Sequence, residues 1–479
     1  MFSFTSISSF HNTLLNGQTT CVEAVRYYIE KIKQYSHLNA WLTVYYDEAL
    51  QRAAMLDDAL NTSQPLLPLF GVVVGLKDVI SYKGHRLTAS SKILANFETI
   101  YNATATQRLL NAGAIIIGRQ NCDEFAMGSS NENSAFGPVK NAADPQRVPG
   151  GSSGGSAVAV QGGMCMISLG SDTGGSVRQP ADFCGIVGLK PSYGRISRYG
   201  LIAYASSFDQ IGIFANNVND VATVLEVIAG PDEFDSTAAQ QQMPSLLKAP
   251  EKTNPYRVAY FPEALNHPSL DPEIGVAIKA FLEKLTNAGH TVQPVDFDLI
   301  DYIVPAYYIL TTAEASSNLS RYDGVKFGYN QNDDAASLTE FYKCNRSGGF
   351  GDEVKRRILL GTFVLSSGYY DAYFAKAQKV RQLLTNFTKK IFEEFDIIVL
   401  PTAPTTAYKI GEKSEDPIAM YLGDIYTVFA NLVGIPAISL PVFTHSNKMP
   451  FGLQAMTAQF NEVHLHGFSK IVMALKESR

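Results

Sequence analysis

The first regular pattern of apolar and polar positions predicts an amphipathic helix over residues 20–35. Apolar residues recur there at steps of three and four, which places them on one helix face. They are Val22, Val25, Ile29 and Ile32. Thr20 and Glu23 have the spacing of a capping box, a side-chain pair that marks a helix N-terminus. We expect a helical segment over about residues 1–60.

Short apolar segments alternate with helix-like segments over the rest of the chain. Residues 72–76 are apolar or glycine and predict a buried strand that ends at Lys77. A helix over 106–112 leads into a strand over 114–117, and another helix begins at Asp271-Pro272. Further predicted strands are 258–261, 291–295, 397–400 and 437–440. This alternation predicts an α/β fold, in which helices cover both faces of a β-sheet.

The chain of 479 residues is expected to form one large domain over residues 1–479. No internal repeat of fixed period is present, and the alternation of strands and helices continues along the sequence. Residues 235–256 are polar, hold three consecutive glutamines and are predicted to form a surface loop.

The composition excludes several classes of protein. Hydrophobic residues make up 46% and charged residues 18%, which excludes an intrinsically disordered chain. The net charge of −6 disfavours unaided nucleic-acid binding, because phosphate contacts need a surplus of Lys and Arg. The apolar runs are shorter than the roughly 20 residues that span a bilayer. Five scattered cysteines without a Cys-x-x-Cys pair argue against disulfides and structural zinc. No Lys or Arg precedes Arg26, so the basic region of a signal peptide is not found. Together these features predict a cytoplasmic protein.

Two glycine–serine clusters in the middle of the chain are the strongest chemical signal. They are residues 150–156 (Gly-Gly-Ser-Ser-Gly-Gly-Ser) and 170–176 (Gly-Ser-Asp-Thr-Gly-Gly-Ser). Flexible linkers are one interpretation, but apolar periodic sequence flanks both clusters. A phosphate-binding loop is another, although neither cluster fits Gly-x-x-x-x-Gly-Lys-[Ser/Thr]. The third is an acyl-transfer site, in which glycine N–H groups bind a developing oxyanion and a serine attacks.

A nucleophilic serine needs a base, and the sequence offers two kinds. None of the eight histidines lies in a glycine–serine context, although a distant one could fold into the site. The other candidate is Lys77, because a lysine directly after a buried strand is expected to be buried and to have a lowered pKa. Asp78 would point to the opposite face of an extended chain and need not restore the charge. A solvated lysine at a strand end is the simpler alternative.

Lys77 and the two clusters together resemble the amidase signature family. Its Ser–Ser–Lys triad matches Ser176, Ser152 and Lys77, and residues 177–181, 185–191 and 193–195 extend the match. The resemblance implies an α/β fold with a large mixed β-sheet covered by helices on both faces.

The resemblance also implies catalytic roles. Ser176 would attack the carboxamide of glutamine, Ser152 would relay the proton, and neutral Lys77 would act as the base. Ser153 would support the lysine, and the peptide before Ser152 would be cis. The oxyanion hole would comprise the backbone N–H groups of Thr173, Gly174, Gly175 and Ser176.

Substrate-binding residues are implied in the same way. Arg356 would bind the α-carboxylate of glutamine and Asp424 its α-ammonium, and a guanidinium and a carboxylate suit those groups. Arg357 is the alternative to Arg356. The other residues expected at the substrate are Met127, Ser129 and Tyr307, with Tyr308 as the alternative to Tyr307. For Ser129 and Ser171, a structural role in a turn is the alternative.

Further motifs resemble one group within the family, the glutamine-hydrolysing subunits of tRNA-dependent amidotransferases. They lie at residues 123–134, 198–201, 313–319 and 355–357. Such a subunit would use no metal or cofactor of its own. It would supply ammonia to a B subunit that uses ATP and Mg²⁺ and binds most of the tRNA, either Glu-tRNA(Gln) or Asp-tRNA(Asn), and a small C subunit would hold the pair. The alternatives are a stand-alone amidase for another small amide and a scaffold with a decayed site, and the retained triad argues against the scaffold.

Overall fold

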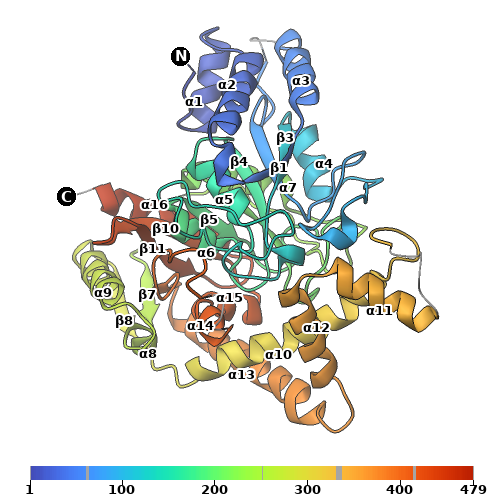
Figure 1. Cartoon of the computed structure of the whole chain (residues 1–479). Helices are drawn as coiled ribbons and strands as arrows, with labels where there is room; N and C mark the ends of the chain where they lie inside the picture. Colours follow the sequence, from blue (N-terminus) through green and yellow to red (C-terminus); the bar gives the residue numbers. More distant parts are fainter. Residues whose placement is uncertain (1, 61–63, 251, 331–336, 414–416, 478–479) are drawn as a thin grey trace.

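The computed structural model describes residues 2–60, 64–250, 252–330, 337–413 and 417–477 (Figure 1). Its centre is an 11-stranded sheet with the order β1-β3-β2-β4-β6-β5-β10-β11-β9-β7-β8. The strands are β1 (Trp41–Val44), β2 (Val73–Lys77), β3 (Ile115–Gln120), β4 (Ile167–Asp172), β5 (Val187–Lys190), β6 (Gln210–Ala215), β7 (Arg257–Tyr260), β8 (Thr291–Pro294), β9 (Ile397–Pro401), β10 (Ala437–Thr444) and β11 (Pro450–Met456).

Helices surround this sheet. In the described part of the chain they are α1 (Ile7–Leu15), α2 (Cys21–Gln34), α3 (Tyr46–Asp58), α4 (Thr104–Asn111), α5 (Gly154–Gln161), α6 (Arg178–Cys184), α7 (Val218–Ile228), α8 (Pro262–Leu265), α9 (Pro272–Asn287), α10 (Ile300–Asn318), α11 (Leu338–Gly349), α12 (Asp352–Val364), α13 (Lys376–Glu394), α14 (Pro417–Leu422), α15 (Val428–Val433) and α16 (Glu462–Glu477).

The sheet is mixed, and one of its parallel parts holds the candidate chemistry. β2 lies between β3 and β4 and is parallel to both, with Leu76 opposite Leu169. The carboxyl ends of β2 and β4 therefore lie at the same edge of the sheet. β2 ends there at Lys77, and β4 ends at Asp172, where the second glycine–serine cluster continues into a turn.

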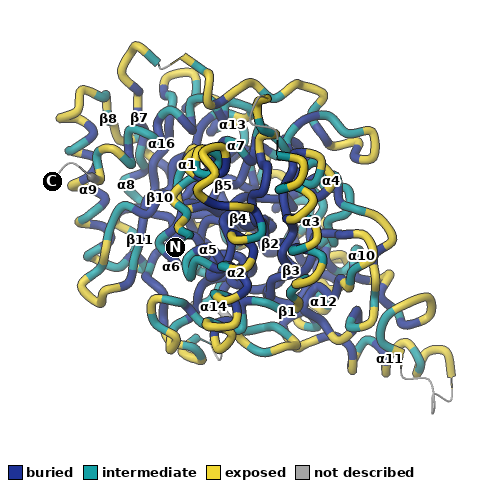
Figure 2. The backbone as a smooth tube through the Cα atoms, turned by 90° about the horizontal axis from the view of Figure 1, so that it is seen from above, coloured by how far each residue is buried: buried dark blue, intermediate teal, exposed yellow. Residues whose placement is uncertain are grey.

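Helices cover both faces of the sheet, as the alternation of strands and helices predicted. A Cβ at Gly188 in β5 would lie 2.4 Å from the Cβ of Ala181 in α6. The next residue, Leu189, adjoins a small apolar cavity that Val221 of α7 and Leu465 of α16 also line. Because neighbouring residues of a strand point to opposite faces, α6 covers one face and α7 with α16 covers the other. Figure 2 shows the buried strands enclosed by helices that are exposed on their outer sides.

Several predicted elements are confirmed individually. α2 begins after Thr20, and both hydrogen bonds of the capping box with Glu23 are present. The strand predicted at 72–76 is β2, and α9 begins at Pro272 with Asp271 as its N-cap. The N-terminal segment is not purely helical, however, because β1 pairs with β3 at the edge of the sheet. A four-residue strand is too short to show a periodicity that separates it from a turn.

A group of helices next to the end of β4 carries other candidate residues. α10 packs against α12, α13 and α15, and Figure 1 shows this group below the sheet. The predicted surface loop at 235–256 contains no helix or strand in its described residues. Across the ranges given above, no helix is both long enough and apolar enough to cross a membrane.

Candidate active site

Lys77 is completely buried at the end of β2, and serine hydroxyls surround its amine. Its Nζ lies 2.7 Å from Ser152 Oγ, 2.9 Å from Ser153 Oγ and 2.9 Å from Ser171 Oγ. An ammonium donates all three hydrogen bonds, whereas a neutral amine donates two and can accept the third from a hydroxyl. The side chain of Lys77 is therefore not solvated, and its amine contacts the hydroxyl of Ser152.

Burial lowers the pKa of Lys77 to about 8, because a water-free environment disfavours the ammonium. The charges of nearby acidic groups, among them Asp123 and Asp172, raise the pKa of Lys77 and limit this shift. A lysine with a pKa near 8 has a substantial neutral fraction close to neutral pH. It can therefore accept a proton under conditions where an exposed lysine cannot.

Ser152 lies in the turn that leads into α5. The Gly151–Ser152 peptide is cis, as the family resemblance implied. The N–H of Gly151 donates to Gln179 Oε1 at 3.0 Å, and Gln179 Nε2 donates to the carbonyl oxygen of Ser129 at 2.9 Å. Gln179 thereby connects the turn of Ser152 to the loop that carries Ser129.

Asp172 holds the turn that carries Ser176. Its carboxylate accepts the N–H groups of Gly175 at 2.9 Å and Val177 at 3.1 Å, and Arg178 donates to both of its oxygens. Burial alone would raise the pKa of Asp172, but the guanidinium of Arg178 holds it at about 2. Ser176 is 9% exposed, whereas Lys77 is fully buried, so the amine is better shielded from water than the serine.

The four N–H groups predicted to form the oxyanion hole are not equivalent in the structure. The N–H of Gly175 already donates to Asp172. Within the described residues, the N–H groups of Thr173, Gly174 and Ser176 have no hydrogen-bond acceptor. Three of the four predicted N–H groups are therefore free to bind a ligand, and the fourth is engaged by Asp172. The conformation of a turn decides this difference, and the residue types do not reveal it.

Two glycines of this turn lie too close to their neighbours to carry a side chain. A Cβ at Gly174 would lie 2.3 Å from the hydroxyl oxygen of Tyr307. Gly175 has φ +128°, and a Cβ there would lie 2.2 Å from Thr427 Oγ1. Tyr307 therefore lies directly beside the turn, and Thr427 lies behind it.

Asp424 is buried and faces two hydroxyl groups. Ser129 Oγ donates to Asp424 Oδ2 at 2.8 Å, and the Tyr308 hydroxyl donates to the same oxygen at 2.9 Å. Burial raises the pKa of Asp424 to about 6, although both hydrogen bonds and the charge of Arg357 oppose the rise. Both tyrosines that the sequence offered as alternatives thus lie at the site, Tyr307 beside the turn and Tyr308 on the carboxylate.

The choice between the adjacent arginines of α12 is corrected as well. Both arginines pair with Glu353, but the side chain of Arg356 is 49% exposed, so it is not buried in the cluster in which it was predicted. The side chain of Arg357 is 3% exposed, donates to the Tyr204 hydroxyl at 2.8 Å and lies over the ring of Tyr308. Its Nη2 is buried and has no hydrogen-bond partner among the described residues. Arg357 therefore takes the place predicted for Arg356.

Other residues complete the surroundings of the site. Met127 is buried in the loop that carries Ser129. The hydroxyl of Ser171, for which a structural role in a turn was the alternative, contacts Lys77. Thr427 and Tyr204 belong to no motif that the sequence analysis used, so no signal in the sequence pointed to them. Their place depends on how α10, α12 and the turn before α15 pack together.

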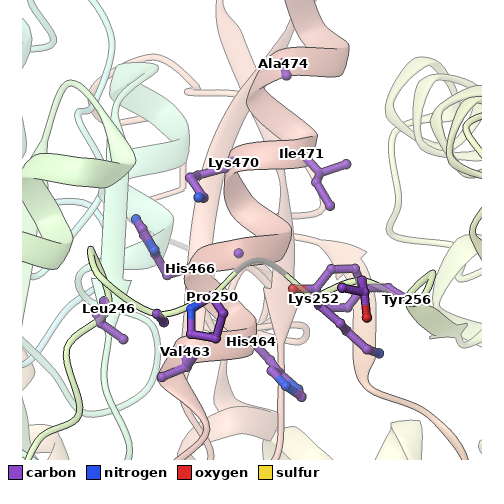
Figure 3. Close-up of a pocket in the computed structure, with 13 residues that line it drawn as sticks. Leu246, Pro250, Lys252, Tyr256, Val463, His464, His466, Lys470, Ile471 and Ala474 are labelled. Atoms are coloured by element: carbon purple, nitrogen blue, oxygen red, sulfur yellow. The ribbon is translucent and has the colours of Figure 1, made fainter.

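A separate pocket of about 670 Å³ lies between α16 and the segment before β7 (Figure 3). Lys252, His464 and His466 are among the residues that line it. Lys252 pairs with Asp396 at 2.6 Å, and His466 Nε2 contacts Asn219 Oδ1 at 3.1 Å. These two histidines thus belong to another part of the molecule than Ser176. In the portion of the chain that the structure describes, no three or more His, Cys, Asp and Glu residues are grouped to hold a metal ion.

The site suits acyl transfer to a serine. It combines a partly neutral buried amine, a serine in a glycine-rich turn and backbone N–H groups of the same turn. The guanidinium of Arg357 and the carboxylate of Asp424 lie on neighbouring residues of the same cluster, joined by Tyr308. A cation and an anion in one buried cluster suit a small zwitterion, which carries one group of each sign.

Comparison with known proteins gives a consistent result. The sequence pattern of the family described as Amidase matches residues 23–465. The A subunit of glutamyl-tRNA(Gln) amidotransferase from Chlorobium phaeobacteroides is 48% identical over 470 residues, with 98% of each chain covered. The protein of the same name from Koribacter versatilis is 51% identical over 451 residues, with 93% of each covered.

A solved structure is similar over nearly the same length. The crystal structure of the glutamyl-tRNA(Gln) amidotransferase A subunit from Thermotoga maritima superposes with a TM-score of 0.78 at 39% identity. The superposition covers 94% of this chain and 91% of that chain. The similarity therefore extends over the sheet, the two glycine–serine clusters and the helices around them.

Proposed function

Because the chain belongs to the amidase family, we propose that it is the glutamine-hydrolysing subunit of a tRNA-dependent amidotransferase. Relatives of that name match it over nearly their full length. The observation that carries the proposal is the buried Nη2 of Arg357, which has no partner in the described residues and lies in one cluster with the carboxylate of Asp424. A free amino acid with a carboxamide side chain supplies a carboxylate for Nη2 of Arg357 and an ammonium for Asp424.

Ser176 attacks the side-chain carboxamide of glutamine in this proposal. Its proton passes to Ser152, whose own proton passes to the neutral amine of Lys77. The N–H groups of Thr173, Gly174 and Ser176 bind the oxyanion of the tetrahedral intermediate. When the C–N bond breaks, Lys77 returns the proton through Ser152 to the departing ammonia, which leaves a glutamyl ester on Ser176. Water then hydrolyses the ester to glutamate.

Glutamine is oriented by its two charged α-substituents. The guanidinium of Arg357 binds the α-carboxylate, and Asp424 binds the α-ammonium with Ser129 and Tyr308 as its supports. Both charges are buried, so water does not weaken these contacts. This assignment replaces Arg356, whose side chain is half exposed.

The ammonia is consumed by partner subunits rather than by this chain. A B subunit uses ATP and Mg²⁺ to activate the glutamyl or aspartyl group on tRNA, and a C subunit holds the complex together. The net charge of −6 fits a subunit that leaves most of the tRNA contacts to its partner. This chain works in the cytoplasm and uses no cofactor.

The rate of glutamine hydrolysis is expected to rise with pH through about 8, because Lys77 must be neutral to accept the proton. The KM for glutamine is expected to rise below about pH 6, because Asp424 becomes protonated there and no longer binds an ammonium. A pH profile of kcat and KM measures both. Asp424→Asn should remove the change near pH 6 and keep the one near pH 8, and a kcat that stays constant through pH 8 would contradict the role of Lys77.

The two adjacent arginines provide a matched test of glutamine binding. Arg357→Lys is expected to raise the KM for glutamine about 10- to 100-fold, because a lysine cannot make the two parallel hydrogen bonds of a guanidinium to a carboxylate. Arg356→Lys, one residue away on the exposed face, should change the KM less than about threefold. Steady-state kinetics of the purified complex with its partner subunits measure both.

The same assay decides between the alternatives. Acetamide, which lacks both α-substituents, should be hydrolysed far more slowly than glutamine. If acetamide were the better substrate and Arg357→Lys had no effect, the chain would be a stand-alone amidase for another amide. If the complex hydrolysed no amide, the chain would be a scaffold with a decayed site.

A further inference from the structure

Thr427 connects the turn beside Ser176 to the turn that carries Asp424. Its hydroxyl donates to the carbonyl oxygen of Gly174 at 2.7 Å, with the carbonyl oxygen of Asp424 as a second acceptor at 3.1 Å. The residue is completely buried and immediately precedes α15. A threonine in this position commonly caps the helix with its side chain, but here the hydroxyl makes no cap hydrogen bond. It contacts the catalytic turn instead.

The peptide between Gly174 and Gly175 is fixed on both sides. Its carbonyl oxygen accepts from Thr427, and its N–H donates to Asp172 at 2.9 Å. Two hydrogen bonds at opposite ends of one amide plane set the rotation of that plane. The N–H groups of Gly174 and Ser176 belong to the peptides on either side, so their directions depend on the same rotation.

The backbone around Thr427 is equally well anchored. Its N–H donates to the carbonyl oxygen of Asp424 at 3.1 Å, and its own carbonyl oxygen accepts from Arg178 Nη1 at 2.8 Å. Arg178 also binds Asp172, which holds the catalytic turn from the other side. Thr427, Arg178 and Asp172 thus form one buried connection between Asp424 and the N–H groups beside Ser176.

We propose that Thr427 is a positioning residue that holds the oxyanion-binding turn at a fixed position relative to the carboxylate of Asp424. A substrate whose ammonium binds Asp424 then places its carboxamide against N–H groups that already point at it. The fixed connection favours amides with an α-ammonium over amides without one. The inference rests on the proposed function, because it assigns the ammonium of glutamine to Asp424.

Thr427→Val tests the hydroxyl at nearly constant side-chain volume. We expect kcat for glutamine to fall about 10- to 100-fold, because a displaced turn stabilises the oxyanion less well, while KM changes less than about threefold. Thr427→Ser keeps the hydroxyl and should retain most of the activity. Thr388→Val is the matched control, since Thr388 is buried in α13 and its hydroxyl donates to the helix carbonyl of Leu384.

The double variant Thr427→Val, Asp424→Asn separates positioning from a general structural role. If Thr427 acts by fixing the turn relative to Asp424, the combined loss in kcat/KM is smaller than the product of the two single losses. If the losses multiply, or if Thr427→Val matches the wild type, the inference is wrong. Should Thr427→Val fail to fold, Thr427→Ala against Thr427→Ser gives the same contrast of hydroxyl absent and present.

Measurements on the wild-type protein distinguish a failure of the proposed function from a failure of the positioning role of Thr427. If it forms no glutamyl ester and hydrolyses no glutamine, the proposed function fails. If it hydrolyses glutamine and Thr427→Val has the same kcat, the positioning role fails while the proposed function stands.

Discussion

Ser176→Ala is expected to lower glutamine-dependent transamidation at least about 10³-fold and to leave ammonium-dependent transamidation unchanged. Removing the hydroxyl removes the atom that forms the ester, and loss of a nucleophilic serine costs about this much or more in other serine enzymes. Added ammonium bypasses the step, because the partner subunit receives the same product from solution. The measurement is the conversion of misacylated tRNA by the reconstituted complex with either nitrogen source.

Ser156→Ala is the matched control for this variant. Ser156 belongs to the same glycine–serine cluster as Ser152 and is completely buried, but its hydroxyl lies near the carbonyl oxygen of Leu169 rather than near Lys77. It should keep glutamine-dependent activity. If Ser176→Ala still used glutamine, or if it lost the ammonium-dependent reaction as well, the assignment of the nucleophile would be refuted.

Lys77→Met is expected to slow acylation of Ser176 at least about 10³-fold while the protein remains folded. Methionine fills nearly the same volume but cannot accept a proton, so Ser152 has no group to which it can pass one. The fold should survive because the hydroxyl of Ser153 keeps its hydrogen bond to the carbonyl oxygen of Ser171 at 3.0 Å. Labelling of Ser176 by a glutamine-like electrophile measures acylation, and thermal unfolding measures the fold.

The pH dependence identifies how Lys77 acts. In the wild type the labelling rate should increase through about pH 8, whereas in Lys77→Met the residual rate should lack this increase. Labelling of Lys77→Met at the wild-type rate would show that another group is the base. An unfolded variant with a low melting temperature would instead assign Lys77 a structural role.

The burial of Lys77 could be predicted from the sequence because a local pattern determines it. An apolar strand followed directly by a lysine predicted that Lys77 is buried, and the family resemblance connected it with Ser152 and Ser176. The parallel pairing of β2 with β4 then brings these segments to the same edge of the sheet. The helix boundaries at Thr20 and Asp271 could be read because capping residues act within a few positions of the chain.

The surroundings of the centre could not be read in the same way. Arg356 and Arg357 are identical in type, and successive residues of a helix point about 100° apart. Which of them is buried depends on how α12 packs against α10, and that contact is distant in sequence. The hydrogen bond from Gly175 to Asp172 depends on the conformation of the turn, so the sequence assigned this N–H to the oxyanion hole. Thr427 gave no signal, because its role comes from a contact with Gly174, more than two hundred positions away in the chain.

The central claim is that a neutral, buried lysine activates Ser176 through Ser152 to form a glutamyl ester. The most direct measurement is mass spectrometry of the wild type and of Lys77→Met after incubation with glutamine and quenching in acid. The claim predicts a glutamyl group on the wild-type peptide that contains Ser176, formed faster as the pH rises toward about 8, and formed at least about 10³-fold more slowly on the same peptide of Lys77→Met. A glutamyl group on a different residue, or one formed equally fast without the lysine, would contradict it.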